Sequence, residues 1–296
     1  MHQMQSSFTS SMLLRVDSLE NIKSSYENQT LRFSCAANWI DYAKKGNTSI
    51  GDHLECTFAH LPKNDDTQFF DSHGHPMGNH LMVTEDQRDG SKYVCFIPSL
   101  LIPSMCFYTV NLEKIEMFEG IPYHPQCTCF MLDKYCECMD YKREDAAFLL
   151  IKDPEQFIEE LSSLVPQLVK DNKMRLTTTR YYQTGQTPSL YVDEVNYDRH
   201  TEADFYNDEA ESYGALFWKY PRYRWQSEVR AIIANINFCQ FYDPNYYDYK
   251  RNRLDIYVPH LKDYTEWFPA KLKSRIDIYR AVGSEEIYYS LGYGQE

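Results

Sequence analysis

Apolar and polar residues alternate over several short segments of the chain, with the two-residue period of a half-buried β-strand. Residues 30–35 alternate in this way, and residues 227–234 are also predicted to form a strand. The turn signal at residues 89–90 predicts that residues 81–84 and 92–97 pair as a hairpin. Further strands are expected at residues 104–110, 146–151, 176–195, 215–218, 253–258 and 276–282.

Apolar residues at helical spacing predict two helices. The clearer one starts at Asp153, whose side chain can cap free amide groups, and Pro154 suits the first helical position. Pro166 is expected to kink or interrupt this helix. A shorter helix is predicted over residues 13–27, and the polar residues 1–12 are expected to be flexible.

Strands outnumber helices in this pattern and do not alternate with them regularly. The sequence therefore predicts an α+β fold with mixed, mainly antiparallel sheets and a few flanking helices. A single domain is expected over residues 13–296, with a possible cysteine-rich hairpin inserted at residues 121–145. Neither a glycine-rich dinucleotide fingerprint nor a Walker A loop occurs in the sequence.

Charge and cysteine usage narrow the class of protein. Asp and Glu number 43 against 30 Lys and Arg, so the net charge of −13 makes nucleic-acid binding an unfavoured function. The sequence has no apolar run near the roughly 20 residues that cross a bilayer, and no secretory leader pattern. The nine cysteines lack the spacing of a secreted scaffold, which favours reduced thiols and a cytoplasmic location.

A cluster of four cysteines is the first candidate for chemistry. Cys127, Cys129, Cys136 and Cys138 form two C-x-C pairs, and four thiolates from a hairpin can surround a zinc ion. The usual zinc spacing is C-x-x-C, so buried structural thiols are the favoured interpretation. A histidine group at residues 73–80 has the H-x-H spacing of some metal sites but no accompanying carboxylate signature.

The second candidate is the segment Gln226-Ser227-Glu228-Val229-Arg230. On a strand, Glu228 and Arg230 lie on one face, and the apolar residues Val229, Ala231 and Ile233 fill the other. An ordinary structural interpretation is an ion pair between Glu228 and Arg230, or with charges on a neighbouring strand.

Gln-x-Glu at the start of a strand, after an aromatic-rich turn, also resembles the catalytic element of ADP-ribosyltransferases. The resemblance implies NAD as cofactor, with Glu228 stabilising an oxocarbenium-like transition state and Gln226 orienting the acceptor. It further implies that Arg32 and Ser34 on an early strand hold the dinucleotide. Thr178, in a run of three threonines, corresponds loosely to the middle-strand element of that family.

A second resemblance covers more of the chain and is less informative. The C-terminal aromatic-x-x-Gln-x-Glu-x-Arg strand looks like that of small uncharacterised bacterial and phage proteins, several of which are phage-defence or toxin-like. This resemblance implies a bacterial or phage source and supplies no reaction.

Two functional hypotheses follow. The first is an ADP-ribosyltransferase or NAD glycohydrolase acting as a toxin or phage-defence effector on a protein or nucleotide acceptor. The second is a non-enzymatic interaction protein, such as an inhibitor, sensor or counter-defence factor, that acts through an acidic, tyrosine-rich surface. Tyrosines 242, 246, 247 and 249 are candidates for that surface.

Overall fold

The structure of the protein is a computed structural model. The structure describes residues 11–44, 56–70, 73–86, 89–111, 116–118, 121–123, 145–168, 187–197, 213–219, 223, 226–236, 253–269, 274–280 and 287–293.

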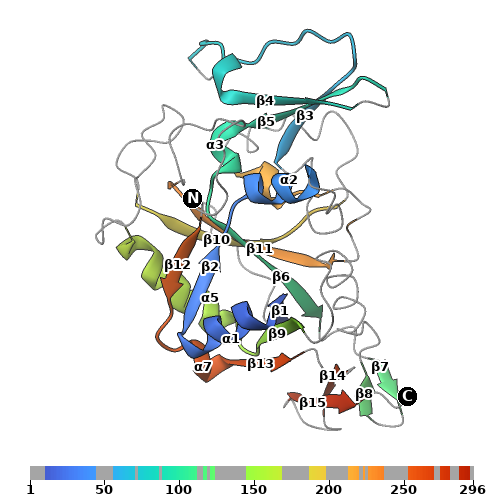
Figure 1. Cartoon of the computed structure of the whole chain (residues 1–296), viewed down its shortest axis with the longest axis vertical. Helices are drawn as coiled ribbons and strands as arrows, with labels where there is room; N and C mark the ends of the chain where they lie inside the picture. The colour runs from blue at the N-terminus through green and yellow to red at the C-terminus, as the bar shows by residue number, and fades with distance from the viewer. Residues whose placement is uncertain are drawn as a thin grey trace.

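A six-stranded sheet with the strand order β10-β11-β6-β1-β9-β13 forms the centre of the fold (Figure 1). Each neighbouring pair in this sheet is antiparallel. Its strands are β1 (Ser11–Ser18), β6 (Ser104–Asn111), β9 (Ala146–Ile151), β10 (Ser189–Glu194), β11 (Glu228–Ala234) and β13 (Thr265–Pro269). Every residue of β9 and β11 is buried, so both faces of the sheet are covered at these two strands.

Smaller antiparallel sheets accompany the central one. β2 (Thr30–Phe33) pairs with β12 (Leu254–Tyr257), and a bridge between Ser34 and Ser104 joins the end of β2 to the start of β6. A three-stranded sheet in the order β3-β5-β4 lies at one end of the molecule (Figure 1). Its strands are β3 (Thr57–Leu61), β4 (Leu81–Glu85) and β5 (Lys92–Phe96). Two further hairpins are β7 (Glu116–Phe118) with β8 (Ile121–Tyr123) and β14 (Ser274–Arg280) with β15 (Ile287–Tyr293).

Helices pack on both faces of the central sheet. The helical elements are α1 (Leu19–Glu27), α2 (Ala36–Lys44), α3 (Ile97–Leu100), α5 (Pro154–Leu164), α7 (Leu261–Tyr264) and the 3₁₀ helices η2 (Gly78–His80), η5 (Val165–Gln167) and η7 (Gly214–Phe217). The first face carries Leu13, Phe107 and Val229, which pack against α1, α5, α7 and the β2–β12 pair. The second face carries Ile232, which packs against α2, α3 and η7.

The structure confirms the predicted fold class, because helices and antiparallel sheets occur together without regular alternation. It also confirms the predicted hairpin, since β4 pairs with β5. The helix predicted at Asp153 is α5: the side chain of Asp153 accepts a hydrogen bond from the amide of Gln156 at 3.0 Å. This helix ends at Leu164, and the 3₁₀ turn η5 holds Pro166, as the missing amide of proline requires.

Three sequence predictions are wrong. Residues 13–18 were predicted to begin a helix, but they belong to β1, and only residues 19–27 are helical. The strand also includes Ser11 and Met12, so the predicted flexible N-terminus does not extend to residue 12, whose side chain is buried. Residues 215–218 were predicted to be a strand, but they fall mostly within η7.

Candidate functional site

The start of β11 is held firmly by the strands on either side of it. Ser227 adopts a φ of 40°, in the left-handed region that residues with a side chain seldom occupy. Its carbonyl accepts a hydrogen bond from the amide of Thr109 at 2.9 Å. The amide of Glu228 donates to the hydroxyl of Tyr197 at 3.0 Å, and its carbonyl accepts from the amide of Val195 at 2.8 Å. These contacts fix the direction in which the Gln226 and Glu228 side chains leave the chain.

Both carboxylate oxygens of Glu228 are bound by cations. Oε1 accepts two charge-assisted hydrogen bonds, from the Nε and Nη2 atoms of Arg230, at 2.9 and 2.6 Å. Oε2 accepts from Nζ of Lys219 at 2.7 Å, and the same Nζ donates to Oε1 of Gln226 at 2.8 Å. The four side chains form one cluster, here called the Glu228 cluster, and each is at most 6% exposed.

Arg230 extends the Glu228 cluster to two other elements. Its Nη1 donates to the carbonyl of Leu216 in η7. Its guanidinium carbon lies 4.7 Å from the ring centroid of Trp39 in α2, which is a cation–π contact. The cluster therefore connects η7 and α2 to β11 on the second face of the sheet.

The cluster sets the protonation of the groups around it. Burial works against the charged form of Glu228, but the cations of Arg230 and Lys219 outweigh it and lower the pKa of this carboxyl. Burial and the Glu228 charge raise the pKa of the Cys106 thiol well above its usual range. The same two causes raise the pKa values of Tyr108 and Tyr197. As a result, the Glu228 carboxylate stays ionised, whereas the neighbouring Cys106 thiol and the two phenols stay protonated.

This arrangement limits what Glu228 can do as it stands. A transition-state carboxylate must face the developing positive charge of a substrate. Glu228 is 3% exposed and its two oxygens already contact the guanidinium and ammonium groups of the Glu228 cluster. A substrate therefore reaches the carboxylate only if Lys219 moves away.

Arg32 lies in a different place. It is on β2, and its Nε and Nη2 atoms donate to the two carboxylate oxygens of Asp255 on β12 at 2.7 and 3.2 Å. The side chain of Arg32 is 42% exposed. The pKa of Arg32 is raised, and the hydrogen bond to Asp255 is the main cause.

The central sheet separates Arg32 from Glu228. Arg15 of β1 donates to the carbonyl of Arg32 at 3.4 Å and to the sulfur of Met105 at 2.9 Å, so Arg32 lies on the side of the sheet that Met105 faces. Consecutive residues of a strand face opposite sides, so Cys106 faces the other side. Cys106 is the register partner of Arg230, whose side chain binds Glu228. The structure does not bring Arg32 and Glu228 together.

The other predicted site residues are placed as follows. Ser34 exchanges backbone hydrogen bonds with Ser104 at 2.8 Å, and its hydroxyl accepts from the side chain of Asn38 at 2.6 Å. Thr178 and the cysteines at 127, 129, 136 and 138 lie outside the described residues. The rings of His73 and His75 are 6.3 Å apart. In the described ranges no three His, Cys, Asp or Glu side chains gather as a metal site would require.

Sequence reasoning missed three members of this neighbourhood. Lys219 is not among the predicted site residues, whereas its side chain is buried in the Glu228 cluster. Tyr197 and Trp39 come from segments far from β11 in the sequence, and no local pattern links them to it. The one local signal is a lysine that directly follows the apolar run at residues 215–218, seven positions before Gln226.

The fold and the Glu228 cluster define an antiparallel α+β protein with a buried ionic cluster on one face of its central sheet. Comparisons with protein-family models, curated proteins and solved structures found no match for this chain. Among the described residues, no helix is long and apolar enough to cross a membrane.

Proposed function

We propose that this chain is a cytoplasmic, non-enzymatic protein that binds a partner protein along the outer edge of β4, as an inhibitor, sensor or counter-defence factor does. The observation that carries the proposal is the edge of the three-stranded sheet. Within the described ranges β4 pairs only with β5, so its other side offers backbone groups to an incoming strand.

An apolar row leads to this edge. Ala59, Val94 and Val83 are register partners across β3, β5 and β4, so their side chains lie on one face. Ala59 and Val94 are buried, whereas Val83 is 55% exposed. Phe70, which lies between β3 and β4 in the sequence, is 52% exposed. A strand added beside β4 covers Val83 and continues the row.

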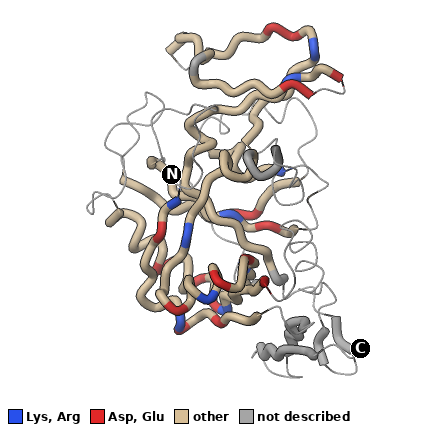
Figure 2. The backbone as a smooth tube through the Cα atoms, viewed as in Figure 1, with Lys and Arg blue, Asp and Glu red and all other residues tan. Residues whose placement is uncertain are grey.

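The charges around the three-stranded sheet favour a basic partner. Glu85 ends β4, and the side chain of Asp66 is 98% exposed. Several acidic positions, in red, lie along this part of the chain (Figure 2). Lys92 lies between the two, but its ammonium group is already 3.8 Å from Asp66 and donates to the carbonyl of Asp65. The acidic surroundings and the net charge of −13 attract a segment rich in Lys or Arg.

Selection from a displayed library of random peptides tests this proposal. The selected peptides are expected to alternate apolar residues with Lys or Arg, because an added strand presents one face to Val83 and the other to solvent. Val83→Arg should abolish their binding and Glu85→Lys should weaken it. Protection of β4 amides from hydrogen exchange should accompany binding.

Tyr191→Arg is the matched control, since Tyr191 is an exposed apolar residue on β10, an edge strand of the central sheet. It should leave peptide binding unchanged. Val83 and Tyr191 both have exposed side chains, so both variants should melt close to the original protein. Peptides that bind the Val83→Arg protein equally well would remove β4 from the proposal, and a selection that enriches no peptide would remove the proposal itself.

A second candidate function is an ADP-ribosyltransferase or NAD glycohydrolase. The observation that favours it is the convergence of Gln226 and Glu228 on one ammonium group, with strained Ser227 between them. Clusters of shifted pKa values and backbone strain are typical of functional sites. In this function Lys219 releases Glu228 when NAD binds, and a group other than Arg32 holds the dinucleotide.

Incubation of the purified protein with NAD distinguishes the two functions. The enzyme consumes NAD, and Glu228→Gln lowers the rate by orders of magnitude. The binding protein leaves NAD intact, and NAD does not raise its melting temperature. NAD consumption that disappears in Glu228→Gln, in a protein shown to be folded, would make the enzyme the correct assignment.

A further inference from the structure

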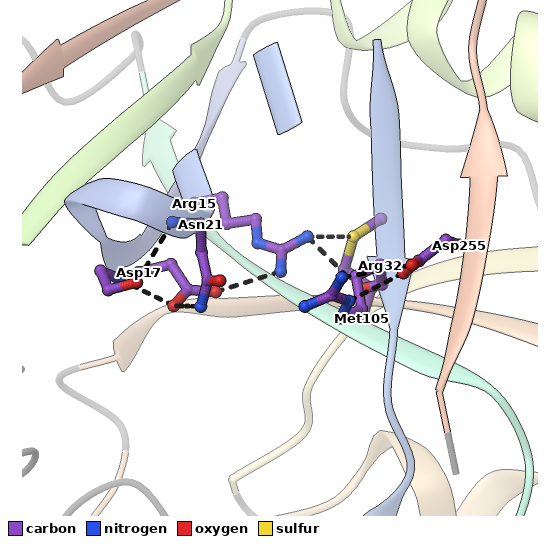
Figure 3. A network of polar contacts seen from close by, with 7 residues as sticks. Arg15, Asp17, Asn21, Arg32, Met105 and Asp255 are labelled. Atoms are coloured by element: carbon purple, nitrogen blue, oxygen red, sulfur yellow. Dashed lines mark hydrogen bonds and ion pairs between the residues drawn. The ribbon is translucent and has the colours of Figure 1, made fainter. Parts of the chain in front are cut away.

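A pocket lined by charged and polar residues lies between α1 and the β2–β12 pair (Figure 3). Its lining consists of charged, amide and hydroxyl side chains: Arg15, Asp17, Asn21, Ser24, Ser25, Thr30, Arg32 and Asp255. Pockets for drug-like ligands are mostly apolar, so this composition favours a ligand with several polar groups.

The charges of the pocket are balanced in two pairs. Nη2 of Arg15 lies 3.3 Å from Oδ2 of Asp17. The guanidinium of Arg32 and the carboxylate of Asp255 form the bidentate pair described above. An anionic ligand would meet two aspartates, and a cationic ligand would meet two arginines. A neutral ligand meets neither penalty, and it can accept from the arginines and donate to the aspartates.

The polar groups of the pocket are oriented in advance. Oδ1 of Asp17 accepts from the amide of Ser18 at 2.7 Å and from Nδ2 of Asn21 at 2.8 Å (Figure 3). Arg15 is held on its other side by the sulfur of Met105. Because these side chains are fixed without a ligand, less conformational entropy is lost when one binds.

An exposed aromatic side chain lies on the same strand pair as three of the lining residues, Thr30, Arg32 and Asp255. Tyr257 is 58% exposed, the highest of the large apolar residues in the described ranges that are markedly exposed. It is the register partner of Thr30 and lies two residues from Asp255, so all three side chains leave the same face of the β2–β12 pair. Its hydroxyl accepts from Nε2 of Gln29 at 3.1 Å, which fixes the ring.

We infer that this pocket binds a neutral polyhydroxylated ring. Adjacent hydroxyl groups of such a ring act as donors to Asp17 and Asp255 and as acceptors from Arg15 and Arg32. Its C–H face packs on Tyr257, as apolar surface does on an aromatic ring. A free sugar and the ribose of a nucleoside share this chemistry. The site is separate from β4 and from the Glu228 cluster, so it does not depend on the proposed function.

Saturation-transfer NMR with the purified full chain tests the inference. The probes are glucose, ribose, adenosine and glucose 6-phosphate, each at about 10 mM because a small ligand with few contacts binds weakly. Glucose should receive saturation and its 6-phosphate should receive less, since the phosphate meets both aspartates. A signal from adenosine and ribose without one from glucose would assign the site to nucleosides instead of free sugars.

Two variants and two controls make the test specific. Asp255→Asn should weaken glucose binding about tenfold and reverse the order of glucose and its 6-phosphate, because Arg32 then loses its counter-charge. Tyr257→Ala should weaken every neutral probe about tenfold. Asp263→Asn and Tyr191→Ala remove an exposed carboxylate and an exposed ring elsewhere, and should change nothing.

The altered side chains of the pocket are more than a third exposed, so both variants should fold. Absence of saturation with all three neutral probes would overturn the inference. So would a preference of the original protein for glucose 6-phosphate, or neutral binding that survives both Asp255→Asn and Tyr257→Ala.

Discussion

Arg230 is the largest of the fully buried side chains in the described residues, and it is a cation. A buried charge is tolerated only when partners compensate for its lost hydration. Glu228, the carbonyl of Leu216 and the ring of Trp39 supply that compensation. The sequence predicted that Glu228 and Arg230 share a strand face, and the structure confirms their ion pair. It did not predict that the pair is buried, because burial depends on elements that lie elsewhere in the sequence.

Because Glu228 is buried, neutralising it should lower the free energy of unfolding more than it would on an exposed strand. On a half-exposed strand the substitution Glu228→Gln would cost about 1 kcal/mol or less. In the Glu228 cluster it leaves two buried cations without their anion, so the free energy of unfolding should fall by about 3–5 kcal/mol. Urea denaturation measures the difference.

Glu27→Gln is the matched control for this substitution. Glu27 pairs with Lys23 on the surface of α1 at 3.7 Å, and its loss should cost no more than about 0.5 kcal/mol. Equal costs at the two positions would contradict the compensating role of Glu228.

The pH dependence of stability should carry the signature of the same carboxyl. The pKa of Glu228 in the folded protein lies below its ordinary value of 4.5. Its contribution is therefore fully present above pH 4.5 and is lost as the pH falls towards the lower, folded pKa. Thermal melts between about pH 6 and 3 should show a steeper loss for the original protein than for Glu228→Gln. Parallel curves would indicate that other carboxyls dominate acid unfolding.

At the scale of elements, strong local sequence signals predicted the helix, the helix break and the hairpin that the structure contains. The cap at Asp153, the break at Pro166 and the turn at residues 89–90 each specify geometry within a few residues, and the structure has α5, η5 and the β4–β5 hairpin there. β1 was missed because it is covered on both faces: Leu13 and Leu14 are consecutive and fully buried. Such a strand does not alternate, so its sequence is easily taken for part of the helix that follows.

The cap of α5 gives a prediction at this scale. Asp153→Ala removes the acceptor for the amide of Gln156 and a favourable charge at the helix start. The free energy of unfolding should fall by about 1 kcal/mol. Ser18→Ala, at the cap of α1, should cost a similar or smaller amount because its hydrogen bond to Asn21 is longer, at 3.2 Å. If urea denaturation shows a larger fall in the free energy of unfolding for Ser18→Ala than for Asp153→Ala, the lengths of the two capping hydrogen bonds do not determine the relative costs.

At the scale of the whole molecule, charge is the dominant feature. The excess of acidic over basic residues gives a net charge of −13, and like charges repel one another across a compact surface. The Glu228 cluster is shielded from solvent ions by burial, whereas surface carboxylates are not. Salt should therefore relieve repulsion at the surface without weakening the ionic core.

The melting temperature should accordingly rise with ionic strength. Between about 10 and 150 mM sodium chloride at neutral pH, an increase of roughly 2–5 °C is expected as surface repulsion is screened. Calorimetry measures it, and a neutral osmolyte at matched osmolality controls for solvent effects other than screening. A melting temperature that falls with added salt would mean that attractive surface pairs outweigh the net charge.

The strand order of the central sheet also determines when each strand finds its pairing partners during synthesis on the ribosome. β1 lies between β6 and β9, so its two partners are separated from it by about one third and one half of the chain. At roughly 10 residues per second, the ribosome needs more than 10 s after β1 to complete β9. Both edges of this apolar strand are unpaired until β6 is made, and the edge that pairs with β9 is unpaired for the whole interval, which is a template for aggregation. Folding in the cell should therefore depend on chaperones that bind the nascent N-terminal segment until β9 arrives.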